Sequence, residues 1–271
     1  MSLRGPAPAD PFPGAVALVT GAGHGIGEAT AKALAAAGTS VIVVDVDGEA
    51  AARTAAAVGG TAHQLDVRDR AAYDALAAAI HDEHGPLDLL VNNAGVGLNA
   101  DFLDMTEQDL DWILGINLGG VINGLRAFGP AMVARGKGHV VNLSSILGYS
   151  PSASTIGYTT TKAAVLELSH SLRADWGRKG VGVSVICPGL INSGIIGRTE
   201  FRGKHAEPDA RASMTRLFER GRQPSAVADA ILDAVRRDRA VVPVGLEARV
   251  GWRLRSLFPA ALVTRMAAAQ Q

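Results

Sequence analysis

The amino-acid sequence predicts a single doubly wound α/β domain, with a central parallel sheet of about seven strands and helices on both faces. Short apolar runs, typical of strands buried on both faces, alternate along the chain with longer helical segments. The first run passes through a glycine-rich turn into a helix, as in the units that build parallel sheets. The chain has 271 residues and is 48% hydrophobic, enough for one large core.

Composition excludes several function classes. Lys plus Arg and Asp plus Glu number 26 each, so no net charge attracts nucleic acid, and we expect no nucleic-acid partner. Cys187 is the single cysteine, which excludes an internal disulfide framework and is compatible with a cytoplasmic protein. It follows a buried strand, where we interpret it as a small core residue. No apolar run is long enough to span a bilayer.

The two ends differ from the domain between them. Residues 1–14 contain four prolines and no apolar segment, which predicts a disordered tail rather than a secretion signal. We place the domain at residues 15–244. Residues 245–271 form an amphipathic extension with basic and aromatic side chains around Trp252. Such a segment can lie on a membrane surface or cover a substrate entrance, but packing on its own core or on a neighbouring subunit is more common.

The glycine-rich turn joins a strand at residues 15–19 to an Ala-rich helix at residues 28–37. Gly21 permits a tight turn, Gly25 lets the backbone approach a pyrophosphate, and Gly27 lets the helix pack closely on the sheet. The helix N-terminus then presents free N–H groups to phosphates. The predicted phosphate-binding turn comprises Gly21, Gly23, His24, Gly25, Ile26 and Gly27.

Asp45 ends the second strand, residues 40–44, and lies twenty-four residues beyond Gly21. A dinucleotide-binding fold places a carboxylate near this position, on the adenosine ribose hydroxyls. The next three residues provide no Arg or Lys for a 2′-phosphate, which Asp45 would repel. We therefore predict NAD as the cofactor. The alternative is that Asp45 only ends the strand or caps the next helix.

Two further strand ends carry candidate cofactor contacts. The third strand, residues 61–65, leads to Asp66 and Val67, which could flank an adenine, although Asp66 could equally cap a helix at residues 71–84. The fourth strand, residues 87–91, runs into Asn92, Asn93, Ala94 and Gly95. Their small side chains let the backbone pass a bound ring, although a plain turn uses the same residues.

A long helical region begins at Thr106 and contains Asn117, Gly119 and Gly120. Each glycine inside a helix costs about 1 kcal/mol relative to alanine, so we expect a kink or a functional role there. Asn117 either faces inward, where it could hold a water beside Lys162, or outward into solvent.

Tyr158 and Lys162 lie four residues apart on a helix predicted to run to about Trp176, after a strand at residues 138–142. Lowering a phenol pKa from 10 to about 7 requires roughly 4 kcal/mol, and one ammonium about 4 Å away can supply it. Lys162 could thus make Tyr158 a proton acceptor. Ser145, where strand meets loop, could hold a substrate oxygen. The alternative is a surface tyrosine and a solvated lysine.

The last third of the chain completes the sheet. A strand at residues 181–186 leads to Pro188 and Gly189. A helix at residues 223–236 and a strand at residues 240–244 follow, and Pro243 places that strand at the sheet edge. The charged segment 194–222 between them is interpreted as a substrate lid, with a fixed surface loop as the alternative.

Taken together, these motifs in this order resemble the short-chain dehydrogenase/reductase family over roughly Ala15 to Val244. The resemblance implies a Rossmann-type domain and a catalytic tetrad of Asn117, Ser145, Tyr158 and Lys162. It also implies cofactor contacts that include the tetrad's tyrosine and lysine; the further contacts are Asp66, Val67, Asn93, Ala94, Gly95, Pro188, Gly189, Ile191 and Ser193. Ser193 stands where the family usually has Thr, but it keeps the hydroxyl.

The resemblance further implies hydride transfer between a secondary alcohol and nicotinamide, with Tyr158 as general acid and base, in a homodimer or homotetramer. Two alternatives are an NADPH-dependent 3-oxoacyl-type ketoreductase, which Asp45 disfavours, and an NAD(H)-binding sensor or scaffold without turnover.

The substrate is expected above the strand ends and to be a small, lipophilic alcohol or ketone, because most of the residues expected there are apolar. They are Val96, Leu98, Ile146, Leu147, Tyr149, Leu190, Ile195 and Ile196. We predict no metal site, since His81 and His84 lack a third histidine nearby and are interpreted as a solvated helix end.

Overall fold

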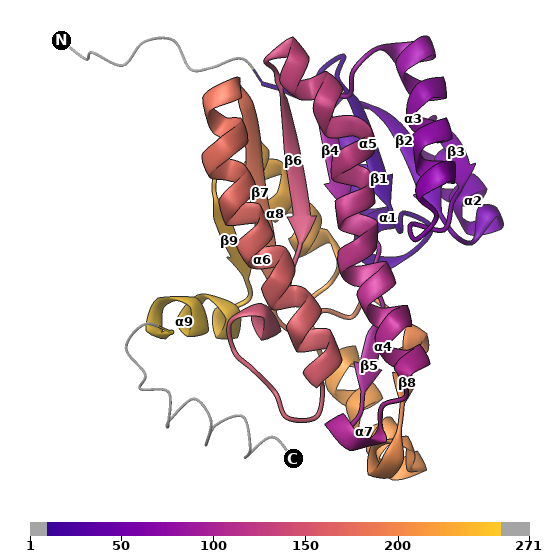
Figure 1. Cartoon of the computed structure of the whole chain (residues 1–271), viewed down its shortest axis with the longest axis vertical. Helices are drawn as coiled ribbons and strands as arrows, with labels where there is room; N and C mark the ends of the chain where they lie inside the picture. Colours follow the sequence, from indigo (N-terminus) through magenta and orange to yellow (C-terminus); the bar gives the residue numbers. More distant parts are fainter. Residues whose placement is uncertain (1–9, 256–271) are drawn as a thin grey trace.

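The computed structural model describes residues 10–255 and contains the predicted parallel sheet, with helices on both faces (Figure 1). Seven parallel strands follow the order β3-β2-β1-β4-β6-β7-β9. They are β1 Val16–Thr20, β2 Ser40–Asp45, β3 Thr61–Gln64, β4 Leu89–Asn92, β6 Gly138–Leu143, β7 Val181–Pro188 and β9 Val241–Val244. The fold prediction is confirmed, and β9, with Pro243, forms one edge of the sheet.

Each face of the sheet has its own hydrophobic core, because side chains alternate along a strand. In β1, Ala17 and Val19 join one core and Leu18 joins the other. The first core contains side chains of α1 Gly25–Ala36, α2 Gly48–Val58 and α8 Ser225–Arg236. The second contains side chains of α3 Arg70–His84, α5 Gly120–Arg135 and α6 Ile156–Trp176. The strands are therefore covered on both faces, as their continuous apolar runs predict.

The strand order changes direction between β1 and β4, which places a crevice at the carboxyl ends of these strands. The glycine turn follows β1 and Asn93 follows β4, so both lie at this crevice. α1 begins at Gly25, inside the turn, three residues earlier than the sequence indicated.

The expected disordered tail needs correction over residues 10–14, since residues 1–9 lie outside the described part. Phe12 is 1% exposed and belongs to the first core. The N–H of Gly14 donates to the carbonyl oxygen of Gly38 at 2.9 Å, and Arg236 pairs with Asp10. A single apolar residue among prolines gave no periodic signal, but it fills a position beside α8.

The helical region after Thr106 consists of α4 Glu107–Leu114, a π-helical turn at Gly115–Gly119, and α5. Thr106 and Asp109 form a capping box at the start of α4. The π-helical turn holds Asn117 fully buried. The irregularity expected from its Asn and Gly residues is therefore present, and it orients Asn117 inward.

A second, small sheet extends beyond the carboxyl ends of the main strands (Figure 1). It pairs β5 Gly97–Asn99 with β8 Thr199–Phe201 in parallel. The described residues also contain short 3₁₀ turns and a further surface helix: η1 Phe102–Asp104, η3 Ile146–Gly148, η4 Gly177–Lys179, η5 Ile195–Arg198, η6 Gly203–Ala206 and α7 Pro208–Glu219. None of the twelve residues of α7 is buried.

Ion pairs fix the middle of the segment 194–222 to the preceding part of the chain. Arg202 binds both carboxylate oxygens of Asp109, at 3.0 and 2.6 Å, and the Asp109 side chain is 6% exposed. Lys204 and His205 pair with Asp101, both at 3.0 Å. The segment is thus anchored at residues 199–205, while α7 lies on the surface.

The C-terminal helix α9, Leu246–Leu254, packs on its own domain. Trp252 meets Tyr149 edge to face at a centroid distance of 5.2 Å, and the Tyr149 hydroxyl donates to the Ala248 carbonyl oxygen at 2.7 Å. Of the placements considered for the extension, packing on its own core fits residues 245–255, and the rest of the extension lies outside the described residues. None of the helices within residues 10–255 is long and apolar enough to cross a membrane.

We predict that the Arg202–Asp109 pair stabilises the fold more than the Lys204–Asp101 pair. The Arg202 guanidinium holds the pKa of Asp109 below its usual value. Replacing Arg202 with Met would leave a buried carboxylate without its cation, and should lower the free energy of unfolding by about 1–3 kcal/mol. Lys204→Met, which removes an exposed pair, should cost at most about 1 kcal/mol.

Urea unfolding at pH 7 measures both changes. Because the folded pKa of Asp109 is depressed, the difference between wild type and Arg202→Met should shrink as pH falls through that pKa. Equal stability of the two variants would contradict this assignment.

Candidate active site

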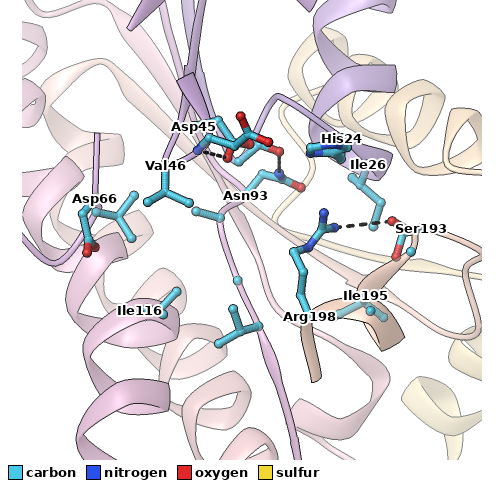
Figure 2. A pocket seen from close by; sticks show the side chains of 18 of the residues that line it. His24, Ile26, Asp45, Val46, Asp66, Asn93, Ile116, Ser193, Ile195 and Arg198 are labelled. Atoms are coloured by element: carbon cyan, nitrogen blue, oxygen red, sulfur yellow. Dashed lines mark hydrogen bonds between the residues drawn. The ribbon is translucent and has the colours of Figure 1, made fainter. Parts of the chain in front are cut away.

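A cavity of about 650 Å³ opens at the carboxyl ends of the central strands (Figure 2). Its walls come from the glycine turn, the ends of β2 and β4, the loop after β3, the π-helical turn and the start of the segment 194–222. The lining includes Gly21, His24, Ile26, Asp45, Asp66, Val67, Asn93, Ala94, Gly95 and Ser193. Most of the residues that the sequence assigned to the dinucleotide therefore gather around one space of suitable size.

The glycine turn packs so closely on its surroundings that side chains are excluded. A Cβ at Gly21 would lie 2.8 Å from the Ala94 Cα, and one at Gly25 would collide with the Ser193 carbonyl oxygen. Both have positive φ, 63° and 57°. A Cβ at Gly27 would collide with the Gly21 carbonyl oxygen. This cradle of bare backbone at a helix N-terminus fits a pyrophosphate.

Asn93 holds the cradle in place. The side-chain amide of Asn93 donates to the carbonyl oxygens of Thr20 and Gly21, at 2.8 and 3.1 Å. Its backbone N–H donates to the Thr20 hydroxyl at 3.0 Å. The end of β4 is therefore tied to the end of β1. Asn93 lines the cavity, but its amide is engaged in supporting the turn.

Asp45 is held at the tip of β2 by backbone donors. Its carboxylate accepts from the N–H of Gly23 at 2.8 Å and from that of Asp47 at 3.0 Å. Asp47, not Asp45, caps the next helix, α2, by accepting from the N–H of Ala50. The helix-cap alternative for Asp45 is therefore wrong, and its carboxylate remains on the cavity wall.

Asp66 forms a forked ion pair with Arg68, with a shortest distance of 2.6 Å, and this guanidinium holds the pKa of Asp66 below its usual value. Asp69 caps α3 instead. Asp66 and Val67 thus line the cavity, as predicted for an adenine site, but with Arg68 as an additional wall residue.

A second cavity, of about 80 Å³, contains Ser145, Tyr158 and Lys162. Pro188, Gly189 and Ile191 form another wall. The two cavities share the lining residues Ile26, Asn93, Gly95, Ser193 and Ile195, so they adjoin. A ligand that extends from Asp45 past the glycine turn would reach the tyrosine and lysine.

Lys162 is 4% exposed, and its ammonium donates to the Leu143 carbonyl oxygen at 2.9 Å. It lies 5.6 Å from the centroid of the Tyr158 ring. Burial lowers the pKa of Lys162 to about 8. The surface alternative is therefore wrong for Lys162, because the ammonium faces the cavity that contains the tyrosine.

The pKa of Tyr158 differs from our expectation. Desolvation raises it to about 12, and the neighbouring Ser145 hydroxyl, which acts in the opposite direction, does not offset this. The expectation of a value near 7 assumed a charge about 4 Å away and neglected the loss of hydration. In the protein alone, Tyr158 is a neutral phenol at pH 7, and thus a proton donor.

Asn117 is fully buried and bonds to both backbone polar groups of one residue, Val96. Its side chain accepts from the N–H of Val96 at 2.9 Å and donates to the Val96 carbonyl oxygen at 3.0 Å. It also donates to the Thr161 hydroxyl, one residue before Lys162, at 3.2 Å. Asn117 therefore ties the loop after Asn93 to the helix of Tyr158.

Comparisons with known proteins agree with this geometry. The sequence model described as short chain dehydrogenase matches residues 15–201. The chain belongs to the short-chain dehydrogenase/reductase family. A solved member from Burkholderia phymatum, in complex with NAD, is similar with a TM-score of 0.84 and 31% identity, over 91% of this chain and 94% of that one.

Two curated relatives are similar at the sequence level. The "Probable oxidoreductase EphD" of Mycobacterium tuberculosis H37Rv is 41% identical over 90% of this chain, which spans 43% of that protein. The "C alpha-dehydrogenase" of Sphingobium sp. SYK-6 is 36% identical over 83% of this chain and 78% of its own length. The chain is thus similar to proteins named as an oxidoreductase and a dehydrogenase, and it spans less than half the length of the first of them.

Sequence reasoning missed several lining residues. Arg68, Trp112, Ile116 and Arg198 line the larger cavity, and Phe218 of α7 lines the smaller one. Of the residues expected around the substrate, Val96 and Ile195 line these cavities, whereas Leu98 is buried in a separate cluster. Within residues 10–255, no group of three or more His, Cys, Asp or Glu is placed to hold a metal ion.

We predict that Lys162→Met makes the protein more stable. A buried ammonium is costly, and its lowered pKa, from 10.5 to about 8, reports that cost. At pH 7 the variant should gain about 1–3 kcal/mol in free energy of unfolding.

The pH dependence provides the control. Between about pH 8 and 10.5 the folded wild type binds fewer protons at Lys162 than the unfolded chain, so wild-type stability rises with pH relative to the variant. The gap measured by urea unfolding should therefore close across this window. A variant that is less stable at pH 7 would overturn the assignment.

Proposed function

We propose that this protein is an NAD-dependent oxidoreductase that interconverts a lipophilic secondary alcohol and its ketone. The observation that supports this most is the adjoining pair of cavities, one with Asp45 and the glycine cradle and the other with Ser145, Tyr158 and Lys162. A dinucleotide in the first would bring its reactive ring to the second.

The charge at the end of β2 supports NAD over NADP. The Asp45 carboxylate would accept hydrogen bonds from ribose hydroxyls, and would repel a 2′-phosphate. Val46 and Asp47 beside it carry no positive charge, and the cation Arg68 is already paired with Asp66. The Burkholderia phymatum relative is in complex with NAD.

In the proposed mechanism, Ser145 holds the substrate oxygen and Tyr158 exchanges a proton with it. The glycine turn and Asp45 would hold NAD, which would supply the hydride acceptor for alcohol oxidation and, in its reduced form, the hydride donor for carbonyl reduction. In carbonyl reduction, neutral Tyr158 donates its proton directly. In alcohol oxidation it must first lose that proton, and the Lys162 ammonium stabilises the resulting tyrosinate. Asn117 holds the loop at Val96 against α6, the helix that carries Tyr158 and Lys162.

The smaller cavity supports a lipophilic substrate. Besides the polar groups that act on the oxygen, its lining includes the apolar side chains of Leu143, Ile191, Ile195 and Phe218. We also propose a cytoplasmic location, with which the single cysteine is compatible, and, as the family resemblance implies, a homodimer or homotetramer. Sizing the protein at low concentration tests the oligomer.

We predict that the protein binds NADH more tightly than NADPH and that Asp45→Ala reduces this preference. Loss of hydrogen bonds to a carboxylate should weaken NADH binding about tenfold or more, whereas NADPH binding should weaken less or improve. Titration followed by nicotinamide fluorescence measures both. Asp82→Ala, an exposed carboxylate on α3, is the matched control and should leave both affinities unchanged. Tighter NADPH binding by the wild type would favour the 3-oxoacyl-type ketoreductase.

We also predict that Tyr158→Phe abolishes turnover without abolishing cofactor binding. The ring and its packing remain, but the transferable proton is lost, so oxidation of a panel of lipophilic secondary alcohols should slow by about 10²–10⁴-fold. NADH affinity should change by less than about threefold. A wild type that binds NADH but turns over no alcohol or ketone of the panel would instead support the sensor or scaffold.

A further inference from the structure

Arg198 is a cation that the glycine-turn motif does not account for. It ends the 3₁₀ turn η5 and projects into the larger cavity, where Figure 2 shows its guanidinium beside Ile26 and Ser193. Its polar contact there is a long hydrogen bond, 3.5 Å, to the Ser193 carbonyl oxygen. Asp66 and Ile116 lie on the other wall in the same view.

The charged groups around this cavity are engaged with one another or with the backbone, which leaves the Arg198 guanidinium available to bind an anion. The other arginine of the lining, Arg68, is held in a forked ion pair by Asp66. Asp45 and Asp47 accept from backbone N–H groups. Within residues 10–255, Arg198 forms no ion pair, whereas its neighbour Arg202 binds Asp109 and Glu200.

The wall that Arg198 faces is the N-terminus of α1, a twelve-residue helix. The first N–H groups of a helix have no partner within it, and the residue before α1, His24, provides no side-chain cap among the described residues. Ile26, in that first turn, lines both cavities. Free N–H donors and an unpaired guanidinium thus converge on one place, and both suit an anion with several oxygens.

We propose that Arg198 binds the diphosphate of the dinucleotide and thereby couples cofactor binding to the position of the segment 194–222. This inference rests on the proposed function. The same segment supplies Phe218 to the cavity of Tyr158. Arg198 lies between the anchor at Arg202 and two glycines, Gly194 and Gly197, at which no atom lies within 4 Å of an added Cβ. An ionic contact at Arg198 would therefore draw this end of the segment toward the cofactor.

The test compares NADH affinity in the wild type, Arg198→Ala, Arg198→Lys and Arg216→Ala at several salt concentrations. Arg216 is the matched control, since it lies in the same segment but lines neither cavity. Arg198→Ala should weaken NADH binding about tenfold and reduce its salt dependence, Arg198→Lys should recover part of the affinity, and Arg216→Ala should match the wild type. NADH affinity of Arg198→Ala within twofold of the wild type would overturn the proposal.

The coupling between cofactor binding and the segment 194–222 is measured separately by trypsin cleavage at Arg211 and Arg216 in α7, with NADH at saturation, in the wild type and in Arg198→Ala. NADH should slow cleavage in the wild type and have a smaller effect in Arg198→Ala. If NADH slowed cleavage equally in the wild type and in Arg198→Ala, the proposed coupling would be overturned. A wild type that does not bind NADH at all would refute the proposed function itself, whereas normal NADH binding by both proteins would refute only the role of Arg198.

Discussion

The close approach of the glycine turn to the neighbouring strand ends is the constraint on which the rest of the site depends. Gly21, Gly25 and Gly27 each lie where a side chain would collide with backbone, and Asn93 ties the turn to the end of β4. This packing sets where α1 begins and leaves its first N–H groups facing the cavity. The positions of Asp45 and Ser193 follow, because both contact the turn.

A second constraint is the burial of Lys162. An ammonium that is 4% exposed, with one carbonyl oxygen as its hydrogen-bond acceptor, is unfavourable for folding. Asn117 and the π-helical turn nevertheless hold the surrounding backbone so that Lys162 stays beside Tyr158. Desolvation acts on both groups at once: it keeps the phenol protonated, and it makes the Lys162 ammonium a stronger acid than that of a solvated lysine. The proposed proton transfer would therefore depend on water exclusion as much as on the distance between Lys162 and Tyr158.

The segment 194–222 combines fixed and exposed parts. Its centre is anchored by Arg202 and by pairing of β8 with β5, whereas α7 has no buried residue. The stretch just before the anchored part presents Arg198 to one cavity, and the exposed helix presents Phe218 to the other. Substrate and cofactor would therefore meet the same stretch of chain, which gives it a natural role in linking the two binding events.

The sequence by itself determined the sheet, the glycine turn, Asp45, and the helix that carries Tyr158 and Lys162, because each depends on local periodicity, turn chemistry or residue spacing. Tertiary structure decided the rest. Phe12 is ordered because α8 and the sheet offer it a core position, and β5 and β8 pair across about a hundred residues of chain, which no local pattern records. The ion pair of Arg202 with Asp109 likewise joins residues that are far apart in the chain, so it depends on long-range packing. The pKa of Tyr158 was mispredicted for the same reason: spacing along a helix gives the neighbour, but only the folded environment sets the hydration that the phenol loses.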